Sequence, residues 1–383
     1  MITIDAVEKV VTFLIMLSVL VVLHELGHFL MARLNRVRVI EFAVGMGPRI
    51  AGWKSKRSGT QYSLRAFLIG GYCLMHGEDG KGNEAEHQRE FAQEPVARKA
   101  HDDDNFQAKS PWNRLAIIVA GPMSNFVIAF FILLFGALVF GIESDTATQT
   151  VVAAVVPGSP AAIGGLRVGD DVVAIDGKPV KTGAALMDVV HGARGREITV
   201  DYLRNGIRYE FDARPVSCGR LDGAVAAGER NDGCIGFSPF PAFTRVGTRE
   251  ALIVSGQEYA NIADNVFGSY GMLFTHFKKY SRQVTGVIGM GQAAATIESF
   301  GAGPYLTLAA TISFALGVLN LLPIPALDGG RGAFIVAELI RRKPVDPERE
   351  GLVHLTGFAV LIMLMIVIAL HDISRIASGQ GVF

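Results

Sequence analysis

The pentapeptide His24-Glu25-Leu26-Gly27-His28 lies within a segment that is apolar enough to cross a lipid bilayer. On a helix, the H-E-x-x-H pattern places both imidazoles on one face, one turn apart, where they can bind the same Zn²⁺. The Glu next to the first His can then act as a general base toward water. The pattern also occurs by chance, but ionisable side chains at membrane depth are expensive and call for a functional explanation. The sequence therefore predicts a zinc site inside the membrane.

A catalytic zinc generally needs a third protein ligand besides water. The candidate is Asp328, in the sequence N-L-L-P-I-P-A-L-D-G-G at Asn320–Gly330. Pro323 and Pro325 break a helix at membrane depth, which is tolerated where the backbone lines protein or a water-filled cavity. From such a turn Asp328 can reach the two His, and zinc would stabilise its buried carboxylate. The alternative is an ordinary Asp-Gly turn at the cytoplasmic surface.

Four segments are long and apolar enough to span a bilayer, which takes roughly 20 residues. They are Val10–Met31, Leu115–Ile142, a stretch within Gly301–Leu327, and Leu352–Leu370. The first is expected to be retained, because the leader carries Asp5 and Glu8 and no A-x-A cleavage site follows. Half of the 383 residues are apolar and the formal net charge is zero. We therefore expect an integral membrane protein that lies in the lipid bilayer and does not bind nucleic acid.

Basic residues next to the predicted spans indicate their orientation. They cluster after the first span, before the second, and between the third and fourth, as Arg33, Arg36, Arg38, Lys109, Arg114, Arg341, Arg342 and Lys343. The two terminal tails contribute only Lys9 and Arg375. The positive-inside rule therefore puts both termini, and the long region between the second and third spans, outside the cytoplasm. The predicted zinc site then lies toward the cytoplasmic side.

Between the first two spans, Val39–Pro48 and Gln61–Met75 have the β-branched, aromatic and Gly content of strands with tight turns. They predict a hairpin-rich element on the cytoplasmic side that dips toward the membrane. Its open edge could accept an extended peptide as an added strand, or the element could be purely structural. The polar stretch Gly77–Ser110 is predicted to be a surface loop. Exposed or capping roles, rather than metal binding, are favoured for His76, His87 and His101.

Val151–Ala213 has the strand and helix signals of a compact soluble unit. Strands are predicted at Val151–Val156, Val172–Ile175, Glu197–Leu203 and Arg208–Phe211, with helices after Ser159 and at Ala184–Val190. The small helix followed by G-D-x-V-x-x-I-D-G resembles a PDZ domain of the permuted bacterial type. This resemblance implies recognition of a peptide or protein ligand by strand addition. The alternative is a steric plug or gate without a ligand.

The chain has three Cys. Cys73 is expected to be a small buried apolar residue. Cys218 and Cys234 bracket a polar stretch of the extracytoplasmic region, and a disulfide between them is favoured in an oxidising compartment. Two unpaired thiols are the alternative, and a metal site built on these Cys is the least favoured. After them, Arg249–Phe300 is predicted to be amphipathic and mostly helical.

In their order and spacing, these motifs resemble the site-2 protease family of intramembrane zinc metalloproteases, and within it the bacterial regulator-of-sigma-E proteases. The resemblance covers nearly the whole chain and includes G-P-M-S-N-F at Gly121–Phe126 in the second span. It implies one Zn²⁺ per chain held by His24, His28 and Asp328, with Glu25 as the catalytic base. It also implies that the second span packs closely on the first, where small residues permit close approach.

The resemblance further implies a set of substrate contacts, at Asn320, Pro323, Pro325, Gly70 and Gly71. The expected substrate is a single-span membrane protein, such as an anti-sigma factor already cut by another protease, or a remnant signal peptide. The expected location is the bacterial inner membrane. Three features depart from the family: we find one PDZ-like unit where the best-known enterobacterial member has two, Val287 stands where Pro is usual, and the insertion between Cys218 and Cys234 is unusual.

We therefore expect a polytopic α-helical membrane protein with four transmembrane helices, a membrane-associated β-hairpin element and one extracytoplasmic α+β PDZ domain. The expected segments are 1–38, 39–110, 111–142, 150–214, 215–300, 301–328, 329–351 and 352–372, in which 150–214 is the PDZ domain, 301–328 is the third span with the zinc-ligand Asp and 329–351 is a cytoplasmic loop. The expected activity is cleavage of a peptide bond within or near a substrate's transmembrane helix. An inactive PDZ-bearing scaffold and a zinc transporter or sensor are the alternatives.

Overall fold

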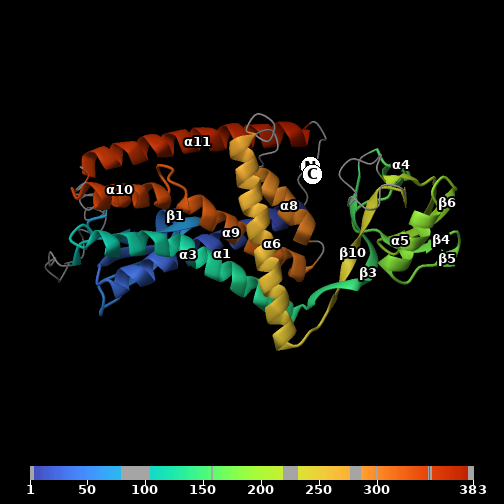
Figure 1. The fold of residues 1–383 in the computed structure, drawn as a ribbon, viewed down its shortest axis with the longest axis horizontal. Helices are drawn as coiled ribbons and strands as arrows, with labels where there is room; N and C mark the ends of the chain where they lie inside the picture. Colours follow the sequence, from blue (N-terminus) through green and yellow to red (C-terminus); the bar gives the residue numbers. More distant parts are fainter. Residues whose placement is uncertain are drawn as a thin grey trace. The chain divides into compact units, whose positions relative to one another are not determined.

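A computed structural model describes residues 4–78, 104–156, 158–218, 232–276, 286–298, 301–343, 345 and 347–377. The chain divides into two compact units (Figure 1). The first unit comprises Met1–Leu133, Ser255–Ile297 and Tyr305–Phe383, and the second comprises Leu134–Val254 and Glu298–Pro304. His87 and His101 lie outside the described residues.

Four helices are long and apolar enough to cross a membrane: α1 (Ile4–Leu34), α3 (Pro111–Val139), α9 (Ala302–Leu321) and α11 (Pro347–Ala377). They confirm the four predicted spans. The α3 helix ends before the predicted boundary, because Gly141 has a positive φ of 97° and lies against the backbone of Thr244. The α9 helix ends at Leu321 because Pro323 disfavours helical geometry in the residue before it.

The segment predicted as a cytoplasmic loop at 329–351 is instead mostly helical, and the third span does not extend to residue 328. Helix α10 (Asp328–Arg341) begins at the predicted zinc ligand, and α11 follows from Pro347. The α10 sequence D-G-G-R-G begins with residues of low helix propensity, which explains why its first turn was predicted as a loop. Helices α6 (Thr248–Thr275) and α8 (Val287–Glu298) occupy the stretch predicted to be amphipathic and helical.

Strands β1 (Val39–Lys54) and β2 (Gln61–Met75) form the predicted hairpin element. Both strands bend, so the segment from Glu41 to Val44 pairs with Gly71–Leu74 on one side and with Gln61–Leu64 on the other. Glycines with positive φ occupy the bends, as Gly45, Gly47 and Gly70. Because L-residues rarely adopt that conformation, these glycines permit two strands to build a wider curled sheet.

A buried carboxylate lies at the centre of this curled sheet. Glu41 is fully buried and accepts hydrogen bonds from the hydroxyl of Ser63, from Arg65 Nη2 at 2.9 and 3.0 Å, and from the hydroxyl of Tyr72 at 2.7 Å. Arg65 Nη1 also donates to the carbonyl of Gly47 at 2.7 Å, which links the charge pair to a strand bend. Burial alone would raise the pKa of Glu41, but the hydrogen bonds outweigh burial and hold the pKa below its ordinary value.

The second unit contains an antiparallel sheet in the order β10-β3-β4-β6-β7, with β5 paired to β4. Its strands are β3 (Ile142–Val155), β4 (Asp171–Ile175), β5 (Lys178–Pro179), β6 (Ile198–Arg204), β7 (Ile207–Ala213) and β10 (Phe237–Thr244). The PDZ-like unit predicted at 150–214 is therefore larger, since β10 pairs along β3 in the same sheet. The missed strand is the sequence F-S-P-F-P-A-F-T, whose two prolines argue against a strand except at an edge, where β10 lies.

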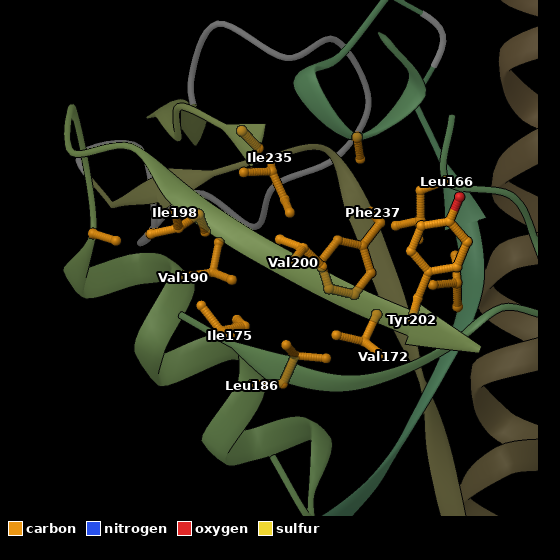
Figure 2. Packing of buried hydrophobic residues seen from close by; sticks show 14 residues of the cluster. Leu166, Val172, Ile175, Leu186, Val190, Ile198, Val200, Tyr202, Ile235 and Phe237 are labelled. Atoms are coloured by element: carbon orange, nitrogen blue, oxygen red, sulfur yellow. The ribbon is translucent and has the colours of Figure 1, made fainter. Parts of the chain in front are cut away.

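Local signals explain the rest of this unit. Ser159 Oγ accepts a hydrogen bond from the amide of Ala162 at 3.2 Å and caps α4 (Pro160–Ile163). Two hairpins turn at Asp176-Gly177 and Asn205-Gly206, all with positive φ, as a two-residue turn requires. Helix α5 (Gly183–Gly192) packs with the strands around a core that includes Val172, Leu186, Val190, Ile198, Val200 and Ile235 (Figure 2).

Helix α11 anchors the start of α8 through one buried carboxylate. Oδ2 of Asp372 accepts hydrogen bonds from the amides of Gly286 and Gly289, both at 3.0 Å. These amides belong to the first turn of α8, where helical N–H groups have no partner within the helix. Asp372 therefore acts as an N-cap supplied by another helix, with its negative charge at the positive end of the helix dipole.

Replacing Glu41 by Gln should destabilise the curled sheet at neutral pH by about 1.5–3 kcal/mol, the typical contribution of hydrogen bonds to a charged group. Because the folded-state pKa is depressed, this stabilisation is present above the unfolded pKa of about 4.3 and is lost as the pH falls through the folded pKa. The difference in melting temperature between wild type and Glu41→Gln, measured in detergent, should therefore shrink on acidification. Glu210→Gln, at an exposed Glu, is the control. An equal difference at pH 7 and pH 3 would contradict the assignment.

Asp372→Ala should loosen the first turn of α8 by about 0.5–2 kcal/mol, the usual cost of losing a cap. Hydrogen exchange of the amides of Val287–Glu298 should become faster by the corresponding factor. Asp264→Ala removes an exposed carboxylate from α6 and should leave this exchange unchanged. Equal protection of α8 in wild type and Asp372→Ala would show that the cap does not hold the helix.

Candidate metal centre

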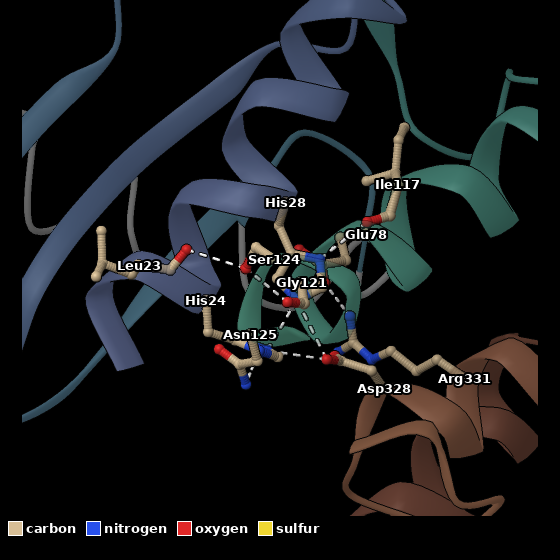
Figure 3. A network of polar contacts seen from close by, with 10 residues as sticks. All are labelled: Leu23, His24, His28, Glu78, Ile117, Gly121, Ser124, Asn125, Asp328 and Arg331. Carbon is tan, nitrogen blue, oxygen red and sulfur yellow. Dashed lines mark hydrogen bonds and ion pairs between the residues drawn. The ribbon is translucent and has the colours of Figure 1, made fainter. Parts of the chain in front are cut away.

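The two His of the H-E-x-x-H pattern face the same side of α1. Both side chains are buried, their ring centroids are 4.9 Å apart, and their Nε2 atoms are 3.2 Å apart. One helical turn separates His24 from His28, so a single point can be reached by both imidazoles. Figure 3 shows them together at the centre of a network of polar contacts.

Asp328 approaches the two His from α10. Its Oδ2 lies 3.0 Å from Nε2 of His24 and 3.2 Å from Nε2 of His28 (Figure 3). The structure thus brings together residues that are 300 positions apart in the chain. Among the described residues, these three form one of two groups whose ligand atoms all lie within 4.8 Å of one another.

A turn with unusual backbone geometry positions Asp328. Ala326 has a positive φ of 77°, a conformation that a residue with a Cβ rarely adopts. Its amide donates a hydrogen bond to Nδ1 of His354 on α11 at 3.0 Å, which holds the turn. Gly329 and Gly330 follow, and a Cβ at either would lie 2.2–2.4 Å from a carbonyl oxygen of the turn. Only glycines allow α10 to begin so close to this turn.

These residues fit a zinc ion. Their three ligand atoms are separated by 3.0–3.2 Å. A tetrahedral site with bonds of about 2.0–2.2 Å has ligand atoms roughly 3.3–3.6 Å apart, so only small movements are needed. Two imidazoles and a carboxylate form a common donor set of catalytic zinc, which leaves a fourth position open.

Each imidazole is oriented through its other nitrogen. Nδ1 of His28 lies 2.9 Å from the carbonyl oxygen of Ile117, and Nδ1 of His24 lies 3.2 Å from the side-chain amide of Asn125. A proton held on Nδ1 leaves the Nε2 lone pair for a metal. Oδ1 of Asn125 is buried with no hydrogen bond in the part of the chain that the structure describes. A 180° rotation of that amide would let Oδ1 accept a proton from His24 and give both His the same tautomer.

Helices α1 and α3 cross very closely at this point. A Cβ at Gly121 would lie 2.2 Å from Nε2 of His28, and a Cβ at Gly27 would lie 2.4 Å from the carbonyl of Ala120. Ser124 Oγ donates across the crossing to the carbonyl of Leu23 at 3.1 Å. Small residues on both helices therefore let the backbone of α3 contact the imidazole of His28 directly.

Glu25 lies on α1 between the two His and is half-buried. It interacts electrostatically with His28, His24 and Asp328, and so belongs to the same charged environment. An unexpected ion pair adjoins it: Glu78, just after β2, contacts Arg331, one turn after Asp328 on α10 (Figure 3). The D-G-G-R sequence places Arg331 on the helix face of Asp328, but no local signal identifies Glu78 as its partner.

The predicted substrate contacts lie around this centre in different environments. Asn320 is half-buried in the last turn of α9, and Pro323 is exposed in the turn that follows. Pro325 packs on α11, where a Cβ at Gly357 would be 2.3 Å away. A Cβ at Gly71 would lie 2.7 Å from a β1 carbonyl and 3.6 Å from Val22 of α1, and Gly70 occupies a strand bend. Gly71 thus has a packing role and Gly70 a conformational role, both independent of any substrate, and the set of substrate contacts stays a prediction.

Comparison with known proteins matches residues 12–364 to the model of peptidase family M50. Zinc metalloprotease RasP of Shouchella clausii is 30% identical, with 97% of this chain and 100% of that protein covered. Zinc metalloprotease RasP of Bacillus licheniformis is 27% identical, with 96% and 99% covered. Among solved structures, the PDZ domain of an SdrC-like protein from Listeria monocytogenes is 21% identical over 26% of this chain and 90% of that chain, with a TM-score of 0.19.

Gly121→Ala should reduce zinc affinity about 10- to 100-fold, the usual effect of disturbing a residue that positions a ligand. The reason is steric, since the added methyl group would occupy the space of the His28 ring. Zinc retained after dialysis against graded chelator measures the change. Gly271→Ala on α6, where a Cβ meets nothing within 4 Å, should retain zinc as wild type does. Wild-type affinity in Gly121→Ala would show that the close crossing does not fix His28.

Proposed function

The chain belongs to peptidase family M50 and is a membrane zinc metalloprotease, and on that premise we propose that it cuts single-span membrane proteins within or near their transmembrane helix. The observation that carries the proposal is the meeting of His24, His28 and Asp328, with Glu25 beside them, among apolar helices. A carboxylate and two imidazoles are costly to bury among apolar helices, so their presence there indicates a functional site.

In this proposal His24, His28 and Asp328 hold the zinc and Glu25 is the general base. Bound zinc supplies a Lewis acid that polarises the scissile carbonyl and acidifies water. The Glu25 carboxylate accepts a proton from the attacking water and delivers it to the leaving amine. With the side-chain amide of Asn125 rotated by 180°, Ile117 and Asn125 keep the two imidazoles in the tautomer that this role requires.

A transmembrane substrate must unwind before it can be cut, because a helix occupies its own amides with hydrogen bonds. We propose that the curled sheet of β1 and β2 offers an edge on which the unwound segment lies as an added strand. Gly70 and Gly71 would then help to hold the substrate extended, and Asn320, Pro323 and Pro325 would contact it near the scissile bond. The buried Glu41 network supports this role, because a rigid sheet lowers the entropy loss on binding.

The orientation follows from the basic residues beside the spans. We propose that both termini and the PDZ-like unit lie outside the cytoplasm of a bacterial inner membrane, with the zinc toward the cytoplasmic side. The disulfide between Cys218 and Cys234 supports an oxidising location for the second unit. Anti-sigma factors trimmed by another protease and remnant signal peptides are the proposed substrates, and the PDZ-like unit would bind a peptide or protein end.

Purified Glu25→Gln protein should lose cleavage of a single-span anti-sigma factor truncated outside the membrane, by roughly 10²–10⁴-fold, and keep its zinc. His24→Ala and Asp328→Ala should lose both cleavage and zinc, and a chelator should inhibit the wild type. Glu250→Gln, at an exposed Glu of α6, should cleave normally. The readout is the product in reconstituted liposomes together with the zinc content of each variant.

Other outcomes of this experiment would identify the alternatives. Equal product with wild type and Glu25→Gln would overturn the base assignment. No product from any truncated substrate, with zinc bound, would favour a membrane scaffold. Zinc flux into the liposomes that persists in Glu25→Gln would favour a transporter.

A further inference from the structure

A second group of metal-ligating side chains lies in the PDZ-like unit. A ring nitrogen of His191 and the sulfur atoms of Cys218 and Cys234 all lie within 4.8 Å of one another. The two Cys form a disulfide in the structure, and Cys218 is fully buried. The sequence suggested the disulfide, but nothing in the spacing linked His191 to it.

The fold brings these residues together through close backbone packing. His191 is in the last turn of α5, and the short strands β8 (Val216–Ser217) and β9 (Gly233–Cys234) pair beneath that turn. A Cβ at Gly233 would lie 2.7 Å from the carbonyl of Val190, so β9 contacts the helix without an intervening side chain. The neighbours Val190 and Ile235 belong to the main core of the unit, as Figure 2 shows. The group is therefore attached to rigid elements on both sides.

His191 has a ring nitrogen without a hydrogen-bond partner among the described residues. Its Nε2 is buried and makes no hydrogen bond within the described part of the chain. A buried polar atom without a partner is unfavourable and calls for an explanation. A structural disulfide needs no imidazole beside it, whereas two thiolates and an imidazole are a common donor set for zinc.

We propose that reduction of the Cys218–Cys234 disulfide creates a second metal site, in which His191, Cys218 and Cys234 bind one Zn²⁺ or a similar thiophilic divalent ion. A dithiol reductant breaks the S–S bond by exchange: its two sulfur atoms become a disulfide, and both electrons and both protons pass to Cys218 and Cys234. Binding of the ion then releases the two thiol protons, since the thiolates are the ligands. The three side chains leave a fourth position for water or another ligand.

Cobalt is the probe that separates this site from the centre at His24, His28 and Asp328. A thiolate bound to Co²⁺ gives an intense near-ultraviolet charge-transfer band, which nitrogen and oxygen ligands do not give. Full-length protein in detergent is reduced with a dithiol, freed of excess reductant under argon and titrated with Co²⁺. The reduced protein should develop the band, and the oxidised protein should not.

Matched variants test each proposed ligand. Cys218→Ser should abolish the band, and His191→Ala should weaken Co²⁺ binding by roughly tenfold or more. Cys73→Ser removes the free thiol and should keep the full band. Hydrogen exchange of β6 in oxidised His191→Ala, compared with oxidised wild type, checks that the unit remains folded. A reduced wild type without the band, or a band that His191→Ala leaves unchanged in affinity, would overturn the proposal.

Discussion

The contact between the imidazole of His28 and the backbone of α3 is the constraint on which the candidate metal centre depends. The absence of a side chain at Gly121 brings α3 so close that Ile117 and Asn125 can orient both His. In a membrane, helix association lacks the hydrophobic driving force present in water, so close packing and interhelical hydrogen bonds supply it. The same few residues thus hold two spans together and orient the proposed zinc ligands.

Polar side chains join neighbouring helices of this protein at several specific positions, which apolar contacts alone would not define. Asp372 joins α11 to α8, His354 joins α11 to the turn before α10, and Arg114 pairs with Glu338 at 2.6 Å to join α3 to α10. These partners sit on helices whose outer surfaces are apolar, and the most apolar window of α11 has no buried residue. Directional hydrogen bonds therefore determine which helices meet, while the lipid-facing residues contribute mainly hydropathy.

The sequence predicted the features that are determined by residues close together in the chain. Hydropathy located the four spans, helical spacing paired His24 with His28, and turn residues located the hairpins of the PDZ-like unit. What it missed depends on contacts between distant segments. The partners of Glu41 lie on another strand, Glu78 and Arg331 are more than 250 positions apart, and His191 meets the Cys pair only through the packing of α5 on β9. The α10 helix was missed because its glycines lower its propensity, although they are what lets it begin against the turn.

The positive φ of Ala326 has a consequence for how the protein is made. The turn that aims Asp328 at the two His is held by His354, which lies near the start of the last span. Because His24 and His28 lie on α1, they are synthesised before α3, α9 and α11, and the turn that positions Asp328 can be held only after α11 is made. Until α11 is in place, the amide of Ala326 cannot donate its hydrogen bond to His354, and the strained turn lacks that support. The geometry that brings Asp328 to the two His is therefore complete only when the last helix has joined the others.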